Sequence, residues 1–353
     1  MKINHSNSTI EKENFNYISD IVLNNFVGEG ERVNKLEDKL KTYLNKKYCV
    51  IVNNGSNALF LGLKAIACSS SDKNEVIVSA YVCPAVINSI LQADLKPVLV
   101  DINKTNLNAS IAEIKNKINS NTIGIIIASI GGVSIEFETL MDYNIPVIED
   151  ICQSIGTKTN NKLAGVVGDF AIMSFGSTKM ISGGVGGAIL CNDERSYEKI
   201  KKMTEYEKDS EFYLKNDFEV SYNMKLSDLS AGLILAQFKA MPDFIHKRKI
   251  IAENYDAILK GKKNVTIIKE TENEFFNRYR YYFITEEVEK FYNVLRSNGI
   301  DARKSLAHNI AKYLRLNNFD NLNYLSNKII SLPIYPNLNV TEQNFILKVL
   351  KNV

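Results

Sequence analysis

The chain has 353 residues, 45% of them hydrophobic, and its formal net charge is only +3. This length is too great for one small core, so we expect one large domain and a smaller one. Its lysines are scattered and no apolar run approaches the roughly 20 residues of a membrane span, so we expect neither nucleic acid nor a membrane as a partner.

The start of the chain and its cysteines lead us to expect an intracellular protein. The first residues are polar and run into charged ones, so no signal peptide is expected. The five cysteines are odd in number and lie mostly in apolar segments, which indicates free buried thiols in a reducing cytoplasm. The three histidines are far apart in the sequence, and no metal site is expected.

The first half of the chain alternates between two patterns. A helix is predicted at 31–46, where apolar residues form one stripe. Strands are predicted at 48–52, 76–78, 97–100, 123–128, 146–148, 170–173 and 188–191, with helices at 57–67, 84–93, 110–118 and 135–142 between the earlier ones. Alternating strands and helices, with runs that are apolar on both faces, indicate a mostly parallel sheet covered by helices.

The second half is predicted to be helical over 195–260, with Ser227 as a cap for a helix at 229–240. From about residue 265 the pattern changes. Strands are predicted at 264–268, 281–284 and 300–302, helices at 286–298 and 342–351, and a rigid extended segment at 332–336. We therefore predict an α/β protein whose large domain covers residues 1–260 and whose smaller α/β domain covers residues 261–353.

The segment after the first predicted strand can bind an anion. Asn54-Gly55-Ser56-Asn57 opens a helix, and in parallel sheets ligands bind at the carboxyl ends of strands. Free backbone N–H groups at a helix start bind phosphate, and Ser or Asn side chains add hydrogen bonds. Taken alone, the segment is explained better as an ordinary helix cap. No Gly-Lys-Ser/Thr sequence follows, which excludes a nucleotide P-loop.

A second candidate is Asp150, which ends the predicted central strand at 146–150. A buried carboxylate is costly unless it is paired, and a protonated pyridine nitrogen would pair it. In extended geometry Asp150 and Cys152 face the same side, so Cys152 would lie under a cofactor ring and Gln153 could reach a ring oxygen. A carboxylate that caps a loop is an equally simple explanation.

A third candidate is Lys179, five residues after Ser174 at the end of another predicted strand. Ser174 can hydrogen-bond a phosphate while Lys179 turns back toward an aldehyde, and burial together with Schiff-base formation would make the amine reactive near neutral pH. Most lysines are solvated surface residues, but this one lies between two apolar strands, beside the glycine-rich stretch 183–187. That stretch precedes a strand, so it is not a dinucleotide loop; we expect it to let backbone pass close to the Lys179 loop.

An amine, a strand-end carboxylate and an anion-binding helix start are what pyridoxal 5'-phosphate (PLP) requires. Together the segments resemble the DegT/DnrJ/StrS-type PLP-dependent nucleotide-sugar aminotransferases, which have the aspartate aminotransferase fold (PLP fold type I). The resemblance covers nearly the whole chain. It rests on 54–59 as the phosphate segment, 149–156 as Glu-Asp-x-x-Gln-x-x-Gly, 168–187 as Gly-Asp…Ser-Phe…Lys…Gly-Gly, 222–226 as Tyr-Asn-x-Arg-Met, and 299–303 with 331–336.

The resemblance implies a role for each matched residue. Lys179 would bind PLP covalently and act as the catalytic acid and base. Asp150 and Gln153 would hold the ring, and the phosphate would bind at Gly55, Ser56, Asn57 and Ser174. In the family the residue that matches Asn223 reaches the cofactor phosphate of the neighbouring subunit, which implies a homodimer with shared sites.

Two departures from the family concern the substrate side of the site. Cys83 stands where the family often places an aromatic residue over the cofactor ring, so either Tyr81 supplies that contact or the ring is held more loosely. Gly176 stands where the family often has histidine. Tyr81 and His308 are candidate sugar contacts, although ordinary packing explains each at least as well.

The implied activity is transfer of an amino group from an amino acid, by resemblance L-glutamate, to a keto sugar. By resemblance that sugar is nucleotide-linked and serves amino-sugar or surface-polysaccharide synthesis. Some dehydrating relatives replace the lysine with histidine, so Lys179 favours amino transfer. The alternatives are another fold type I PLP enzyme acting on a small amino acid, and a non-catalytic regulatory relative.

Overall fold

The computed structural model describes residues 1–23, 27–68, 72–204 and 221–353. Within these residues the centre is a seven-stranded sheet in the order β1-β10-β9-β6-β5-β2-β4. Of these strands only β10 runs in the opposite direction, since it pairs antiparallel with both β1 and β9. The strands are β1 Tyr48–Val52, β2 Glu75–Ser79, β4 Lys96–Val100, β5 Thr122–Ala128, β6 Val147–Asp150, β9 Phe170–Ser174 and β10 Gly187–Cys191. The predicted mostly parallel sheet is confirmed.

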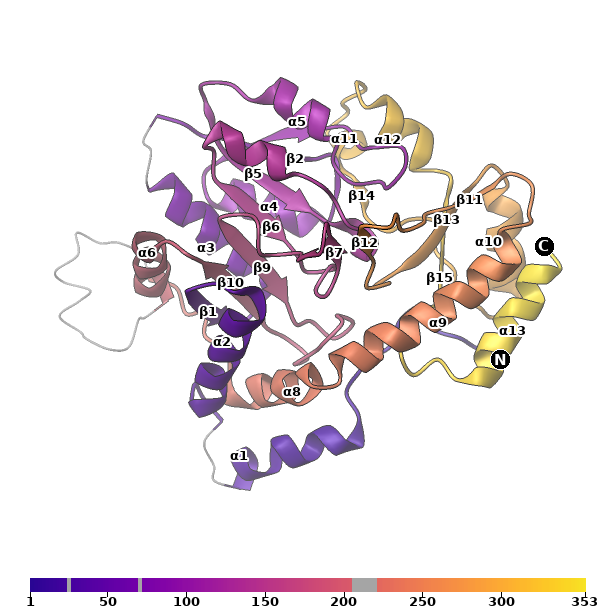
Figure 1. The fold of residues 1–353 in the computed structure, drawn as a ribbon, viewed down its shortest axis with the longest axis horizontal. Helices are drawn as coiled ribbons and strands as arrows, with labels where there is room; N and C mark the ends of the chain where they lie inside the picture. Colours follow the sequence, from indigo (N-terminus) through magenta and orange to yellow (C-terminus); the bar gives the residue numbers. More distant parts are fainter. Residues whose placement is uncertain (24–26, 69–71, 205–220) are drawn as a thin grey trace.

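Helices cover both faces of this sheet (Figure 1). One face packs against α3 Gly55–Ala67, α4 Pro84–Gln92 and α6 Glu194–Thr204, and the other against α2 Glu31–Leu44, α5 Ile111–Lys117 and α8 Asp228–Phe238. Alternate strand side chains face opposite sides. In β1, Val50 and Val52 lie in the α3 core, whereas Cys49 and Ile51 lie in the α2 core.

The helix predicted at 135–142 is wrong. The structure has only a short 3-10 helix there, Glu138–Tyr143. Ile135 and Phe137 are both buried in the core beneath β5 and β6. Residues two apart lie on different faces of an α-helix, so an α-helix could not bury both against one sheet.

The helical stretch predicted at 195–260 divides into α6, α8 and α9 Met241–Leu259, and its residues 205–220 lie outside the described part. Residues 221–227 are not helical. The predicted cap is confirmed, because the Ser227 side chain accepts a hydrogen bond from the Ser230 N–H at 3.3 Å. In Figure 1, α9 runs from the large sheet toward the C-terminal end of the molecule.

A second sheet in the described C-terminal part has three strands, β11 Val265–Ile267, β13 Tyr281–Thr285 and β15 Ile329–Leu332. It packs with α10 Val288–Ser297 and α13 Val340–Lys351 as predicted. The strand predicted at 300–302 is wrong: Ile300 forms only an isolated bridge with Ile3. β15 was not predicted, because only its first two residues form an apolar run. Pro333 follows the strand, lacks a backbone N–H and ends the ladder of hydrogen bonds.

The division between residues 260 and 261 stays a prediction. Helix α9 contributes Phe244 to the core of the large sheet and Tyr255 to the core of the small one.

The remaining short elements are η1 Lys12–Tyr17, α1 Ser19–Leu23, β3 Tyr81–Val82, η2 Ile130–Gly132, β7 Lys158–Thr159, β8 Lys162–Leu163, β12 Glu274–Phe275, β14 His308–Asn309, α11 Ile310–Tyr313 and α12 Asp320–Leu325. Among the described residues, no helix combines the length and apolar character needed to cross a bilayer.

The glycine-rich stretch 183–187 brings three backbone segments together. Phe175 N–H donates to the Gly186 carbonyl at 2.8 Å, and Gly183 N–H donates to the Phe175 carbonyl at 3.0 Å. A Cβ on Gly187 would lie 2.3 Å from the Asn54 carbonyl carbon. The stretch therefore passes close to the loop that carries Lys179, as expected, and also to the start of α3.

The N-terminal segment is tied to the small sheet through His5. Its ring Nε2 lies 2.9 Å from the Ser331 Oγ, and its backbone N–H donates to Asp301 Oδ2 at 3.3 Å. Burial, with the positive charges of Arg280 and Arg303, lowers the pKa of His5 to about 3. The folded chain therefore holds this imidazole in its neutral form well below the usual pKa of histidine, about 6.5.

We predict that His5 makes folding stability fall in mild acid. The unfolded chain takes up the His5 proton near pH 6.5 and the folded chain does not, so its contribution is complete above pH 6.5 and declines toward pH 3. Between pH 7 and pH 5, the unfolding free energy of wild type should fall by about 2 kcal/mol more than that of His5→Gln, as measured by urea denaturation. The exposed His246 provides the control, since His246→Gln should keep the wild-type slope. An unchanged slope in His5→Gln would contradict the prediction.

Candidate active site

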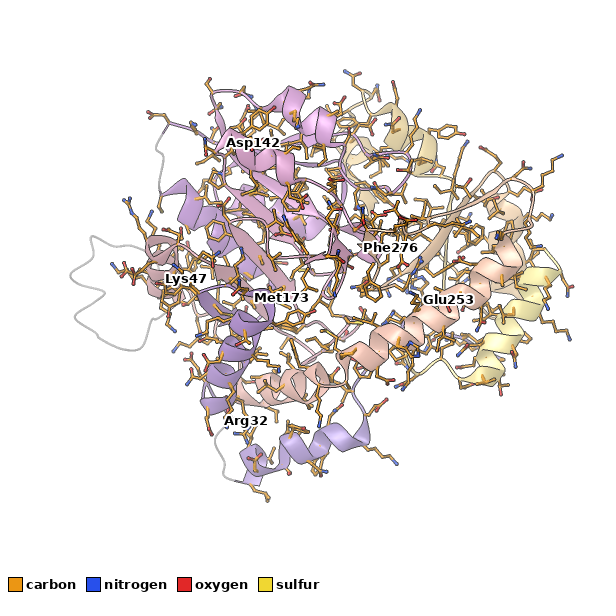
Figure 2. The ribbon with its side chains drawn as sticks, viewed as in Figure 1. Arg32, Lys47, Asp142, Met173, Glu253 and Phe276 are labelled. Atoms are coloured by element: carbon orange, nitrogen blue, oxygen red, sulfur yellow. The ribbon has the colours of Figure 1, made fainter. Side chains whose placement is uncertain are left out.

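A cavity of about 250 Å³ lies at the carboxyl ends of the parallel strands. Most of the predicted site residues line it, namely Gly55, Ser56, Cys83, Asp150, Cys152, Gln153, Ser174 and Lys179. Its other walls include the apolar Leu59, Val86, Ala128 and Ile130. Figure 2 labels Met173, which precedes the cavity residue Ser174 on β9. Motifs that are up to 124 residues apart in the sequence (55 to 179) therefore meet in one hollow.

The carboxylate of this cavity comes from β6. Asp150 is the last residue of the strand, and its Oδ1 accepts a hydrogen bond from the Cys152 N–H at 3.1 Å. That bond fixes the turn through which Cys152 and Gln153 also reach the cavity. Burial and the nearby Asp150 raise the pKa of the Cys152 thiol well above its usual value. Cys152 therefore forms an uncharged wall beside the Asp150 carboxylate.

The start of α3 closes the second side of the cavity. Asn54 is the N-cap, and its side chain accepts from the Asn57 N–H at 2.8 Å. A Cβ on Gly55 would lie 2.8 Å from the Cβ of Ser174, so glycine lets the helix start lie directly against the end of β9. The first turn of α3 and the two hydroxyls of Ser56 and Ser174 thus face the same hollow. This arrangement suits an anion such as phosphate.

Asn57 lies outside this lining. Its Nδ2 donates to the Asn53 Oδ1 at 2.6 Å, and its backbone N–H is taken by the Asn54 cap. The structure therefore assigns Asn57 a place in the cap of α3, and Ser56 is the residue of this pair that reaches the cavity.

Lys179 reaches the cavity from a tight turn after β9. Its backbone N–H donates to the Gly176 carbonyl at 3.0 Å, which folds the chain back after Ser174. Burial lowers the pKa of Lys179, but Tyr279, Cys152 and Asp150 together raise it above its usual value. In the free amine, neighbouring groups therefore outweigh desolvation; the expectation that burial together with Schiff-base formation makes Lys179 reactive near neutral pH stays a prediction.

Sequence reasoning missed Tyr279, which contacts the lysine directly. The Lys179 Nζ lies 5.6 Å from the centroid of the Tyr279 ring. Burial raises the pKa of Tyr279, but the positive charges of Lys179 and Arg280 and a hydrogen bond with Thr178 lower it further than burial raises it. Only the run of aromatic and arginine residues ahead of β13 marks this segment in the sequence. Figure 2 labels Phe276 at its start.

Gln153 is held by the same segment. Its Oε1 accepts from the Gly131 N–H at 2.8 Å, and its carbonyl accepts from the Asn277 Nδ2 at 2.9 Å. Asn277 is fully buried and also donates to the Ile155 carbonyl at 2.9 Å. The loop after β6 is therefore fastened to residues 277–280, and Asn277 is a second residue that sequence reasoning missed.

The remaining predicted residues divide between two places. Cys83 lines the cavity as the N-cap of α4. Tyr81 is buried, and its hydroxyl accepts from the Leu306 N–H at 3.0 Å. Tyr81 and His308 instead line a separate hollow of about 970 Å³. Of the two residues considered for the ring contact, Cys83 is the one that reaches the main cavity.

Asn223 lies away from the cavity of its own chain. It is exposed, and it adjoins Met224, whose carbonyl accepts from the Asn53 N–H at 2.7 Å. The segment of Asn223 is thus tied to the residue that precedes the cap of α3. The side chain itself faces solvent.

The chemistry of these groups fits PLP. An amine at Lys179 can bind the aldehyde, and the carboxylate of Asp150 can pair a protonated ring nitrogen. The start of α3 with Ser56 and Ser174 can hold the phosphate. The apolar walls can enclose a flat ring, as in most cofactor sites.

Comparison with known proteins gives a consistent result over the whole chain. The model of the DegT/DnrJ/EryC1/StrS aminotransferase family matches residues 8–351. GDP-perosamine synthase of Vibrio cholerae is 27% identical over 351 residues, which are 95% of each chain. Helicobacter pylori PseC, an aminotransferase involved in the biosynthesis of pseudoaminic acid, superposes with a TM-score of 0.90 at 22% identity, over 100% of this chain and 99% of that chain.

The same fold also carries a different reaction. The E. coli GDP-4-keto-6-deoxy-D-mannose-3-dehydratase with bound hydrated PLP superposes with a TM-score of 0.88 at 23% identity, over 99% of this chain and 100% of that chain. Because aminotransferases and a dehydratase share it, the fold alone does not choose the reaction.

We predict that Tyr279 sets the protonation of Lys179. Tyr279→Phe removes the hydroxyl that raises the pKa of Lys179, so the pKa should fall. The rate at which Lys179 reacts with acetic anhydride in cofactor-free protein, followed by peptide mass spectrometry from pH 7 to 11, should then rise at lower pH than in wild type. Tyr43→Phe is the control, because Tyr43 packs against Phe238 away from the cavity. Identical curves for wild type and Tyr279→Phe would refute the prediction.

Proposed function

Because the chain belongs to the DegT/DnrJ/EryC1/StrS aminotransferase family, we propose that it transfers an amino group from an amino acid to a keto sugar, with PLP as cofactor. L-glutamate is the proposed donor and a nucleotide-linked keto sugar the proposed acceptor. GDP-perosamine synthase among the relatives supports an acceptor of this kind. The product would enter amino-sugar synthesis.

One observation carries the proposal: Lys179, Asp150, Ser56 and Ser174 line the same cavity at the carboxyl ends of the strands. Each supplies one of the three functions that the cofactor needs, an amine, an anion and a phosphate site. PLP would supply an electron sink for the carbon that loses its proton.

Lys179 is the proposed acid and base. Its Nζ would take the proton from the α-carbon of the donor and return it on the cofactor side, and the second half-reaction would reverse these steps. The raised pKa of the free amine suits the return of the proton. The Lys179 amine would be free to accept a proton only after the donor has displaced it from the cofactor.

Asp150 and the surrounding contacts are proposed to hold the ring. The hydrogen bond from the Cys152 N–H orients the Asp150 carboxylate, which would keep the ring nitrogen protonated. Gln153, whose Oε1 accepts from the Gly131 N–H, would meet a ring oxygen. Cys83 and Cys152 would face the ring with polarizable thiols in place of an aromatic stack.

We also propose a homodimer with shared sites. The exposed position of Asn223, beside the cap of α3 but outside its own cavity, supports a contact with the phosphate site of a second copy. A cytoplasmic location is proposed from the five free cysteines, since reduced thiols persist there. Tyr81 and His308, in their separate hollow, are proposed as sugar contacts only.

We predict a two-step change in the visible absorbance of the protein. PLP should produce a bound-cofactor band, and L-glutamate should convert it to the band of the aminated cofactor. Lys179→Ala should slow that conversion by at least about 10²-fold, the usual contribution of a positioned acid and base. Lys263→Ala, at an exposed lysine, should behave as wild type.

The same measurement separates the alternatives. A band with no conversion by L-glutamate, together with turnover of a small amino acid, would favour another fold type I reaction. No band at saturating PLP would sink the proposal and favour a non-catalytic role. Conversion that survives in Lys179→Ala would remove Lys179 from the mechanism.

A further inference from the structure

Gln237 is a buried polar side chain outside the cavity that the proposed mechanism does not use. It lies in the last turn of α8, and its exposed fraction is 0%. Its Oε1 accepts from the Ser182 N–H at 3.1 Å and also from the Thr9 hydroxyl. Its Nε2 donates to the Ser182 carbonyl and, at 3.0 Å, to the Leu233 carbonyl. Both donors and both acceptor positions of this amide are therefore used.

The main partner of the Gln237 amide is the loop that carries Lys179. Ser182 follows Lys179 by three residues (182 − 179) and is fully buried, and Met180 and Ile181 between them are buried in the same core. With the N–H and the carbonyl of Ser182, the amide forms the pair of bonds that a neighbouring β-strand would form. A buried peptide group without partners is costly. Loss of the amide would therefore favour a displaced loop.

Helix α8 also holds this loop by its shape. A Cβ on Gly183 would lie 2.7 Å from the Ser230 carbonyl oxygen and 2.9 Å from the Ile234 Cγ1, so the backbone of the loop lies directly against the helix. Helix α8 itself packs between α2 and α1 (Figure 1). The loop thus rests on an element that is supported from two sides, and Gln237 is its polar attachment point.

The anion side of the cavity is held by other contacts. Gly187 pairs with Ser174 and with Val52 in the large sheet. Ser56 lies in the capped first turn of α3. These contacts belong to the sheet and to the cap of α3, so they do not depend on the amide of Gln237. A change at Gln237 can therefore displace the lysine while the proposed phosphate site stays in place.

We propose that Gln237 is a positioning residue that holds Lys179 where its amine meets the cofactor aldehyde, an inference that rests on the proposed function. The bond from the Lys179 N–H to the Gly176 carbonyl fixes the turn before the lysine, and Gln237 fixes the chain after it. Formation of a covalent bond requires the reacting atoms in a narrow range of positions. Through Thr9 the same amide also binds the N-terminal segment, whose His5 contacts the small sheet.

The test compares two forms of the cofactor. PLP can bond to Lys179 through its aldehyde, whereas pyridoxamine 5'-phosphate has the same ring and phosphate but an amine in place of the aldehyde. The full chain, freed of cofactor, is titrated with each by calorimetry. In Gln237→Met the Kd of PLP should rise at least about tenfold, and that of pyridoxamine phosphate should stay within about twofold of wild type. Equal weakening of both would show a general loss of structure and overturn the proposal.

Two further variants test whether the bonds to Ser182 are the cause. Thr9→Val removes the outer bond and leaves both bonds to Ser182, so it should raise the Kd of PLP less than Gln237→Met does. A rise as large in Thr9→Val would overturn the proposal. Tyr255→Phe is the control for a lost buried hydrogen bond, because the Tyr255 hydroxyl donates to the Pro333 carbonyl in the core of the small sheet. Both Kd values should stay within about twofold of wild type there.

The proposed function fails separately from this inference. If wild type gives no bound-cofactor band with PLP, the function is at fault. If wild type gives the band and Gln237→Met binds PLP as tightly, only the role of Gln237 is at fault. Should Gln237→Met fail to fold by circular dichroism, Gln237→Glu decides, because a carboxyl group has the shape of the amide but cannot donate to both the Ser182 and Leu233 carbonyls. Weaker binding of PLP alone then supports the proposal, and an unchanged ratio of the two Kd values overturns it.

Discussion

The parallel pairing of β6 with β9 is the constraint on which the site depends. Asp150 at the end of β6 pairs in register with Ile172, two residues before Ser174 ends β9. Parallel strands end at the same edge of a sheet, so the carboxylate and the turn that carries Lys179 must emerge together. Antiparallel β10 adds the third segment, because Gly187 pairs with both Ser174 and Val52 and so brings the end of β1 to that edge. Helix α3 starts from there.

The electrostatics of the site follow from this meeting point. Lys179 and Arg280 both lie close to the Tyr279 ring and bring positive charge to it, and Asp150 is a carboxylate that lines the cavity. Buried cations raise the free energy of the empty site unless anions compensate them. Part of that compensation is internal, since the Tyr279 phenol and Lys179 each favour the charged form of the other. The remainder favours ligands with phosphate and carboxylate groups.

Much of this arrangement could be predicted from the sequence, because local patterns carry it. All seven strands of the large sheet stand out as apolar runs, and the cap at Ser227 follows from its side chain. The motif resemblance is confirmed by the family to which the chain belongs. That Asp150 and Lys179 serve one site was expected from the motif resemblance, whereas the pairing of β6 with β9 is seen only in the structure.

The failures have one physical origin, which is contact between distant segments. Ile135 and Phe137 are not helical, because both side chains are buried in the core of the sheet. Ile300 pairs with Ile3 rather than with a strand. Tyr279 lies 100 residues beyond Lys179 (279 − 179), and no local pattern shows that its hydroxyl will reverse the effect of burial on the lysine. Tertiary neighbours, unlike periodicity, cannot be read along the chain.

The most direct test of this account is to find which lysine carries the cofactor. The protein is saturated with PLP, the linkage is reduced with borohydride, and the modified peptide is identified by mass spectrometry. The account predicts one modified residue, Lys179, and loss of that label in Lys179→Ala. A label on another lysine, such as Lys46 beside Gly168 at the opposite edge of the sheet, or no label at all, would contradict it.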